Sequence, residues 1–577
     1  MVNMRKTYCK AHMVFADVTA LADSTPSTND NSDIADVSLL NGKVSVNDYG
    51  TLELNQFVLD GSKTVINNPN DIAFMSQEQS GAECKFSTNP LVTFAFSQNH
   101  TSAGITLNFG FDYPTEIVVT WYAANNIKLL AKTYYPDATT YVCRQQIENY
   151  QKITVEFIKT RLPYRYAELQ WIIYGLEIDW TGADIQSAKV TEEVDVTSST
   201  LSINTANISI IDANNDFDIE NDDGAWKAIQ KTQEVTLTEY VNDEPIPCGV
   251  FFINGKSFSK NIASFELIDR IGLLDNYTFD QGEMYTNKPI GDIIKAIFAC
   301  ANITDYEISD DVYNLTVSGT LDIQSCREAL QMCCFTVGAL ADDSRTGTIK
   351  IYKPDRYVKY TIPINRKFNG NTEVSLKEYV SGVSITSNVY ALDVDASNIY
   401  DDALPAGDTR IEFSDPYDPT TITVSSGTIK EKKVHYMIVN MKNSGQCTIT
   451  GKKYEKTTLT TAVNDEYVDA NEVANIKEFG DLTLHNSDIM KDTADSLLRY
   501  YKLRKEINLK YIIEKEQSGD WVAVNNVRGQ SATSLVEIQS IDLVGGFLST
   551  ATCCGYSVVV TDYAFTGTEL YAGGDYL

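Results

Sequence analysis

Alternation of apolar and polar residues between Val190 and Asp275 constrains the fold of this chain more than any other feature. Period-2 alternation over short runs is typical of strands that bury one face. Asn254-Gly255 lies between two such runs and predicts a tight hairpin turn there, because both residues tolerate positive φ. The stretch predicts a small β-barrel or sandwich that serves as a scaffold. Its alternating apolar residues are Val194, Val196, Leu201, Ile203, Ile208, Ile210, Val235, Leu237, Val241, Phe265 and Leu267.

The same alternation, with turn signals about every ten residues, marks residues 38–180. It predicts an antiparallel sandwich or jelly roll. Before it, residues 1–37 read as an N-terminal segment, one strand or a short helix, and a linker, because Asp23–Asp33 is polar and contains Pro26. The apolar positions of the sandwich include Ile105, Leu107, Phe109, Ile117, Val119, Trp121, Ile153, Val155 and Phe157.

The period changes after the first barrel, predicted over 181–280. Apolar residues then recur at helical spacing, and Ser325 with Glu328 has the spacing of a capping box. Residues 281–370 therefore predict a small α/β module. The first predicted helix places these residues on one face: Ile290, Ile293, Ile294, Ile297 and Phe298.

Strand patterns return over 371–550 and predict a second barrel, interrupted by one long helix that Asn486 or Ser487 would cap. The Asp-rich stretch Leu392–Thr421 reads as a long surface loop. Residues 551–577 form a C-terminal tail, read as an added strand or a partner-binding extension. The predicted fold class is mainly β with a small α/β module, a multidomain β-barrel and β-sandwich protein.

Charge and cysteine content exclude several classes of function. The chain has 577 residues, 47 Lys or Arg and 78 Asp or Glu, for a net charge of −31. Such a chain should not bind nucleic acid over a broad surface, because phosphate binding needs cationic side chains. Its eleven cysteines contain no CxxC pair, which favours buried, reduced thiols in a reducing cytoplasm. No apolar run is long enough to span a bilayer, and no signal peptide is expected.

Known catalytic and metal-binding patterns fit poorly. Asp212, Asn214 and Asp216 begin like a calcium loop, but Phe217 stands where the loop needs Gly and Asp223 where it needs Glu. A solvated acidic turn is the better interpretation. Gly255-Lys256-Ser257 lacks the upstream Gly of a phosphate-binding loop and lies between predicted strands.

Catalysis has no better support. The four histidines are far apart in sequence, and no nucleophile motif is present. A carboxylate pair for glycoside hydrolysis cannot be singled out among the acidic residues. We therefore expect no enzyme, no metal and no cofactor. The four histidines are His12, His100, His435 and His485.

Four aromatic residues in the predicted sandwich are candidates for stacking against a sugar: Trp121, Tyr122, Tyr134 and Tyr135. In alternating strands about half of such side chains belong to the core instead. Glycan binding is therefore one alternative for this domain, and core packing is the other.

Ten stretches, in their shared order, resemble baseplate hub or tail-tip proteins of phages and prophages from Firmicutes-type hosts. The resemblance covers most of residues 40–550. Its segments are Glu53–Ser62, Gly104–Tyr122, Trp171–Gly175, Leu201–Asn221, Glu266–Asn276, Cys326–Pro354, Lys377–Thr386, Ile449–Glu455, Ala494–Arg504 and Val536–Phe547.

The resemblance implies a structural subunit of the virion tail, assembled in the host cytoplasm. It implies a homotrimeric ring whose two barrels per subunit continue the tail tube and anchor a spike, with tube, spike and baseplate proteins as partners. The N-terminal sandwich resembles a discoidin-type or carbohydrate-binding module, with a host-surface glycan as a further partner. An acidic channel would let DNA pass without binding it. The alternative is a surface adhesin that binds glycan through the sandwich and acts as a monomer.

Overall fold

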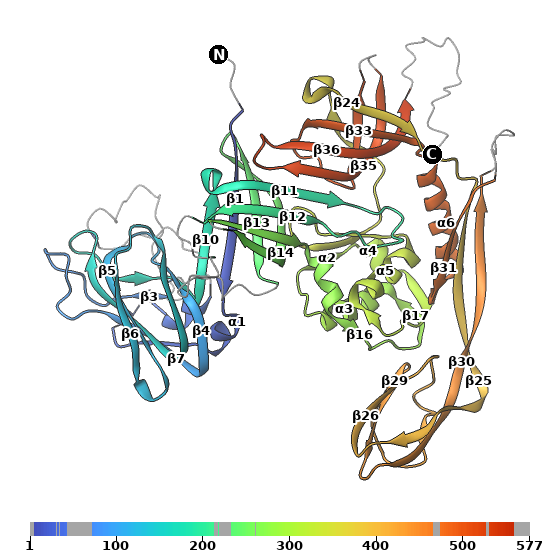
Figure 1. Cartoon of the computed structure of the whole chain (residues 1–577), viewed down its shortest axis with the longest axis horizontal. Helices are drawn as coiled ribbons and strands as arrows, with labels where there is room; N and C mark the ends of the chain where they lie inside the picture. The colour runs from blue at the N-terminus through green and yellow to red at the C-terminus, as the bar shows by residue number, and fades with distance from the viewer. Residues whose placement is uncertain are drawn as a thin grey trace.

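The computed structural model describes residues 5–30, 32–33, 35–42, 53, 72–212, 217, 232–259, 261–465, 474–526 and 530–558. It is a mainly β protein with a small helical region, as the sequence predicts. The parts are arranged around one large sheet, with the N-terminal sandwich on one side and the helical module and a long ribbon on the other (Figure 1).

The main sheet has thirteen strands among the described residues, and they come from both ends of the chain. All its pairs are antiparallel except β23 with β34. In spatial order the strands are β10 (Gly175–Thr181), β1 (Thr7–Ala16), β13 (Glu234–Val241), β14 (Glu244–Ser259), β15 (Ile262–Ile268), β12 (Thr205–Ile211), β11 (Ile185–Glu193), β35 (Ser531–Asp542), β36 (Leu548–Val558), β33 (Lys505–Ile512) and β24 (Lys367–Leu376), with β34 (Trp521–Asn525) beside β35 and β23 (Val358–Ile362) beside β34.

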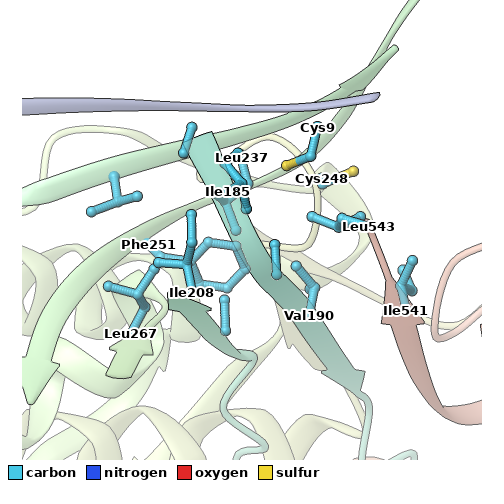
Figure 2. Close-up of a cluster of buried hydrophobic side chains, with 14 of the residues drawn as sticks. Cys9, Ile185, Val190, Ile208, Leu237, Cys248, Phe251, Leu267, Ile541 and Leu543 are labelled. Carbon is cyan, nitrogen blue, oxygen red and sulfur yellow. The ribbon is translucent and has the colours of Figure 1, made fainter. Parts of the chain in front are cut away.

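The two predicted barrels form one continuous wall. Strand β11 pairs with β35 from Lys189↔Asp542 to Glu193↔Ile538, and this pairing joins the two halves. One hydrophobic core then runs through both halves (Figure 2), and Val190 and Ile541 are among its buried residues. Domain boundaries drawn around two separate barrels therefore miss the shared core.

Strand β1 belongs to this sheet rather than to an N-terminal linker segment. It pairs with β10 on one side and β13 on the other, and Met13 and Phe15 are buried in the shared core. A short helix, α1 (Val18–Asp23), follows it, with Asp17 as its N-cap. The next residues, predicted as a linker, form β2 (Thr25–Thr28) on the sandwich sheet.

Asn254-Gly255 does not form the predicted hairpin. Both residues lie inside β14, where the register with β15 shifts between Ile253 and Gly255. The two residues thus mark a β-bulge, another structure in which Gly is favoured. The tight turn of this region joins β13 to β14 at Asn242 and Asp243, whose φ values are 52° and 67°.

The N-terminal domain is an antiparallel sheet of six strands, with a two-stranded sheet and its own hydrophobic core beside it. The six-stranded sheet contains β2, β4 (Leu91–Asn108), β7 (Thr140–Thr160), β5 (Pro114–Tyr122), β6 (Lys128–Tyr134) and β9 (Trp171–Ile173), and the small sheet contains β3 (Phe74–Met75) and β8 (Glu168–Leu169).

The α/β module packs two helices over three short sheets. All five residues of the predicted apolar face on α3 (Ile290–Cys300) are buried. Helix α5 (Cys326–Val337) begins with the predicted capping box between Ser325 and Glu328. The other elements are α2 (Arg270–Leu273), α4 (Asp310–Tyr313), β16 (Thr278–Phe279) with β20 (Gln324–Ser325), β17 (Tyr285–Pro289) with β19 (Thr316–Gly319) and β32 (Leu484–His485), and β18 (Tyr306–Ile308) with β22 (Ile349–Tyr352) and β21 (Leu340–Asp342).

Much of the region predicted as a second barrel leaves the sheet as a ribbon (Figure 1). Strand β25 (Gly382–Leu404) pairs with β30 (Gly445–Asn464) over nearly its whole length. The prediction of a long loop over Leu392–Thr421 was wrong, because these residues continue β25 and form β26 (Gly407–Glu412). Both faces of the outer ribbon meet solvent, so its polar composition resembles that of a loop.

A small sheet ends the ribbon, and a helix returns the chain to the main sheet. The end sheet, here called the tip, contains β26, β29 (Tyr436–Met441) and β28 (Thr428–Lys432); β27 (Thr423–Val424) and β31 (Ile476–Leu482) flank the ribbon. Helix α6 (Ser487–Tyr501), capped by Asn486 as predicted, packs against β25, β30 and α5. The excursion starts after Leu376 and ends before Lys505, and these two residues are register partners in neighbouring strands.

Candidate functional site

A buried polar junction connects both halves of the main sheet to the α/β module through hydrogen bonds and ion pairs. Its centre is an ion pair between Glu192 of β11 and Arg345 of the module, with Arg345 Nε 2.5 Å from Glu192 Oε1. Arg345 Nη2 lies 3.3 Å from Glu192 Oε2. Two nitrogens of the guanidinium thus lie against the carboxylate, and Nη2 donates the hydrogen bond.

The second half of the sheet completes the coordination of this pair. Gln539 of β35 donates from Nε2 to Glu192 Oε2 (2.5 Å) and to the carbonyl of Glu516 (2.9 Å). Arg345 Nη2 donates to the same carbonyl (3.0 Å), and Tyr511 of β33 donates its hydroxyl to Gln539 Oε1 (3.1 Å). The side chains of Glu192 and Gln539 are therefore satisfied only when β11, β33, β35 and the module are all in place.

A second ion pair extends the junction toward the sheet edge. Arg366 Nη2 lies 2.8 Å from Glu516 Oε1, and its Nε donates to the carbonyl of Ile512 (2.9 Å). Glu516 is buried. The loop after β33 is thereby fixed to the segment that precedes β24.

Three carboxyl groups lie where the first half-sheet meets the module. Asp269 caps α2 by accepting from the amide of Gly272 (2.8 Å), and it accepts from the amide of Asn204 (2.5 Å). Asp343 accepts from the amide of Arg270 (2.8 Å) and from Asn204 Nδ2 (3.2 Å). The third, Asp342, accepts from Ser344 and is also buried.

Burial and the repulsion between neighbouring carboxylates raise the pKa values of acidic groups in the junction. Burial and the neighbouring Asp343 raise the pKa of Asp269 well above its ordinary value. Burial raises the pKa of Asp343 to about 6. Burial also raises the pKa of Glu192, because it outweighs the attraction of Arg345. Protonation of one of these two carboxyl groups removes the repulsion between Asp269 and Asp343.

Backbone conformation supports a positional role for Arg345. Its φ is 69°, a region that residues with a Cβ rarely adopt. Gly347, two residues after Arg345, has φ of 72°, and a Cβ there would lie 2.6 Å from the side chain of Val250. The turn therefore fits closely against β14 and aims Arg345 at Glu192.

The contacts of the junction hold the half-sheets and the module together, and its charged groups are used by one another. A cavity of about 260 Å³ lies beside it, lined by Asp342, Arg345, Lys359, Asp520 and Trp521 among others. Its Lys359 and Asp520 side chains already pair with each other at 2.8 Å. The described residues contain no group of three or more His, Cys, Asp and Glu side chains placed to hold a metal ion.

The candidate glycan residues lie apart from the junction and do not form one surface. Trp121 and Tyr134 are buried in the core of the N-terminal domain. Tyr122 is half-buried, and Lys152 Nζ lies 4.1 Å from its ring centroid. Only Tyr135 is well exposed, at 65%. Exposed aromatic residues that the sequence interpretation missed are Phe111 and Tyr164, in loops of the same domain.

The four histidines have separate partners, as their sequence spacing indicates. His12 lies between Glu177 and Asp179, and His100 lies between Asp17 and Asp23. His435 contacts Thr320 and His485 contacts Ser387, each through a hydrogen bond of 2.8 Å.

Of the calcium-like segment, Asp212 and Phe217 are described, and Asn214, Asp216 and Asp223 lie outside the described residues. Asp212 accepts from the amide of Phe217 (2.7 Å), whose ring is buried in the shared core. All eleven cysteines are free, and nine of them are buried. No helix in the described part of the chain is both long enough and apolar enough to cross a membrane.

Comparison with known proteins gives partial structural similarities to tail proteins. No protein-family model and no curated protein sequence matches the chain. A tail protein from Neisseria meningitidis MC58 is similar over 66% of this chain and 93% of its own, with 10% identity and a TM-score of 0.40. Prophage tail protein gp18 from Listeria monocytogenes EGD-e is similar over 65% and 91%, with 8% identity and a TM-score of 0.38. An E. coli type VI secretion component, described as similar to T4 tail proteins gp27 and gp5, is similar over 65% and 74%, with 10% identity and a TM-score of 0.32.

Proposed function

We propose that this protein is a structural subunit of a phage-type tail, at the baseplate hub or tail tip. Three copies form a ring that continues the tail tube and anchors a spike. The observation that carries the proposal is the continuous main sheet, in which β11 pairs with β35 and one core runs through both halves. The sequence resemblance to hub proteins implies two barrel-like halves per subunit, and a sheet with two halves that share one core agrees with this.

The buried junction suits a subunit that must transmit force without changing shape. Buried ion pairs contribute little net stability, but they fix geometry, because any displacement leaves a charge unpaired in the core. Glu192, Arg345 and Gln539 hold both half-sheets and the module in one arrangement. We infer that the protein acts by assembly and carries out no catalysis.

The net charge of −31 agrees with a role around passing DNA. A negatively charged lumen repels phosphates, so a genome does not stall on the wall. Tube, spike and other baseplate proteins are the expected partners, and the assembled location is the virion tail after assembly in the host cytoplasm.

Negative-stain class averages of the purified protein, together with its mass by light scattering, test this proposal. We expect a particle of three chains with threefold symmetry and a central hole. Monomers at every concentration, or a ring without a hole, would overturn the ring. A lumen with a positive surface would overturn the acidic channel.

The alternative function is a glycan-binding adhesin that acts through the N-terminal domain, and the exposed ring of Tyr135 favours it. Stacking on a sugar needs a free aromatic face. A glycan array probed with the whole protein tests this function. Binding that Tyr135→Ala removes and Tyr164→Ala leaves intact would support it, and an array without signal would exclude binding to the glycans displayed.

A further inference from the structure

Strand β24 ends the main sheet, and among the described residues only β33 pairs with it. Residues 372–376 are all exposed, although they lie in a regular strand. An open sheet edge presents unpaired backbone groups and is a template for pairing with another chain. The opposite edge strand, β10, differs because it packs against β4 and β7 of the N-terminal domain.

The exposed side chains of β24 include apolar residues on the core face of the sheet. Val374 is the register partner of Ile507, and directly opposite residues of a strand pair share one face. Ile507 is 3% exposed and belongs to the shared core, whereas Val374 is 56% exposed. Leu376, two residues on and therefore on the same face, is 73% exposed. The face of the sheet that bears the core thus continues onto β24, where no described residue covers Val374 and Leu376.

Two further exposed apolar residues lie at the start of this strand. Ile364 belongs to the short helix that directly precedes β24, and Phe368 is the second residue of β24. Large exposed apolar patches on soluble proteins usually mark interaction sites. The edge of β24 and its surroundings therefore have the composition of an interface.

The charge of the strands at this edge is opposite to that of the whole chain. Residues 366–377 and 504–512, which contain β24 and β33, hold six Lys or Arg and two Asp or Glu. The remaining 556 residues contain 41 Lys or Arg and 76 Asp or Glu. Some of these cations are paired within the chain, as Arg366 is with Glu516 at 2.8 Å and Lys377 with Glu537 at 2.9 Å. The edge is still net basic in an acidic protein, so the rest of another copy is electrostatically complementary to it.

We propose that the β24 edge, residues 367–376, binds a second copy of this chain and forms the contact between neighbouring subunits. The proposal rests on the ring described under the proposed function and names the strand that closes it. The partner copy places an acidic surface against the basic edge and covers Val374 and Leu376. A contact between two different surfaces of identical chains generates a closed ring when the rotation between neighbours closes.

Paired substitutions test the edge. Val374→Glu with Leu376→Glu removes the apolar contact and adds negative charge facing an acidic partner. Both side chains are exposed, so the fold should persist, and circular dichroism verifies this. The matched control is Leu392→Glu with Val394→Glu on the ribbon, where both apolar residues are also exposed. Sedimentation velocity over a concentration series, at low and high salt, gives the dissociation constant of each protein.

We expect the edge variant to dissociate at a concentration at least about a hundredfold higher than the unmodified protein, because two apolar contacts are lost per interface. The ribbon variant should assemble like the unmodified protein. Salt should weaken assembly of the unmodified protein, because it screens the complementary charges. An edge variant that trimerises unchanged overturns this inference and leaves the ring intact. An unmodified protein that stays monomeric overturns both.

Hydrogen exchange distinguishes a second copy from a segment of the same chain as the occupant. Those amides of residues 372–376 that point away from β33 should be protected in the trimer and should exchange quickly after dilution to monomer. Protection that persists in the monomer and disappears when residues 559–577 are removed would show that the chain covers its own edge, and would overturn the inference.

Discussion

The charged groups of Glu192 and Arg345 lie 2.5 Å apart in the core, although 153 residues separate them in the chain. Glu192 belongs to the strand that joins the two half-sheets, and Arg345 belongs to the module. The pair is therefore a direct contact between the main sheet and the module, beside the contacts of Asn204 with Asp343.

Replacement of Arg345 by Met should destabilise the protein by about 3–5 kcal/mol, because it leaves the carboxylate of Glu192 buried without its cation. Urea unfolding gives the difference. The double variant Glu192→Met with Arg345→Met should recover most of the loss. Arg161→Met is the control, since its pair with Asp112 is partly exposed and should contribute about 0–1 kcal/mol. Equal losses for Arg345→Met and Arg161→Met would contradict the role assigned to the junction.

The titration of Asp343 should lower the free energy of unfolding as pH rises from about 4 to about 6. Its pKa is about 6 in the folded protein against an ordinary value of 3.8, so the folded state binds more protons than the unfolded chain in this window. Asp343→Asn removes this titration, so the variant should gain stability relative to the unmodified protein as pH rises across the window. Urea midpoints at half-unit pH steps measure the difference. Asp311→Asn, on the exposed side of α4, should leave the slope unchanged; an unchanged slope in Asp343→Asn as well would refute the prediction.

His12 should stabilise the protein at neutral pH and lose this effect in alkali. Hydrogen bonds to Asp179 and Glu177 raise the pKa of His12 to about 9 from 6.5. The stabilisation is complete below pH 6.5 and is lost as pH rises through 9. The stability difference between the unmodified protein and His12→Gln should therefore shrink over this range, as thermal unfolding at several pH values would measure. A difference that stays constant with pH would mean that His12 does not titrate as inferred.

Ser325→Ala should destabilise the module by about 1 kcal/mol, because it removes the N-cap of α5. The Ser325 hydroxyl accepts from the amide of Glu328 (3.2 Å), and the Glu328 carboxylate accepts from the amide of Ser325 (3.0 Å). Glu328→Gln keeps the reciprocal bond and should have a smaller effect. Calorimetry compares the three proteins, and a loss in Ser325→Ala no larger than that in Glu328→Gln would contradict the prediction that the Ser325 cap contributes most of the effect.

Local patterns were sufficient for helices and for strands with one buried face. The face of α3 from Ile290 to Phe298, the capping box of α5 and the Asn486 cap of α6 all depend on residues within a few positions of one another. Each of these predictions is confirmed, because the physics that determines a helix end or an apolar stripe is local.

Elsewhere local sequence patterns could not predict the structure, because it depends on partners that are distant in the sequence. Strand β1 is fixed by partners that are about 160 to 240 residues away in sequence, which no local pattern reveals. The ribbon has solvent on both faces beyond its base, so Leu392–Thr421 lacks the apolar alternation that marks a strand. Trp121 is buried and Tyr135 is exposed because of the side of the strand or turn on which each lies. The residue type alone does not reveal that side.

One signal for the junction was present in the sequence. Ala188 and Val190 lie on one face of β11, Val194 follows directly after the strand, and Glu192 occupies the position between Val190 and Val194 in this alternation. A carboxylate in an apolar register must have a buried partner, because an unpaired buried charge is too costly. The identity of that partner, Arg345, could come only from the fold.

The pairing of Leu376 with Lys505 has a consequence for how such a subunit can diversify. The ribbon, the tip and α6 all lie between two residues that face each other across adjacent strands. An insertion or a deletion between these two residues can therefore change the length of the arm without shifting the register of β24 with β33, whereas an insertion or a deletion inside either strand would shift it.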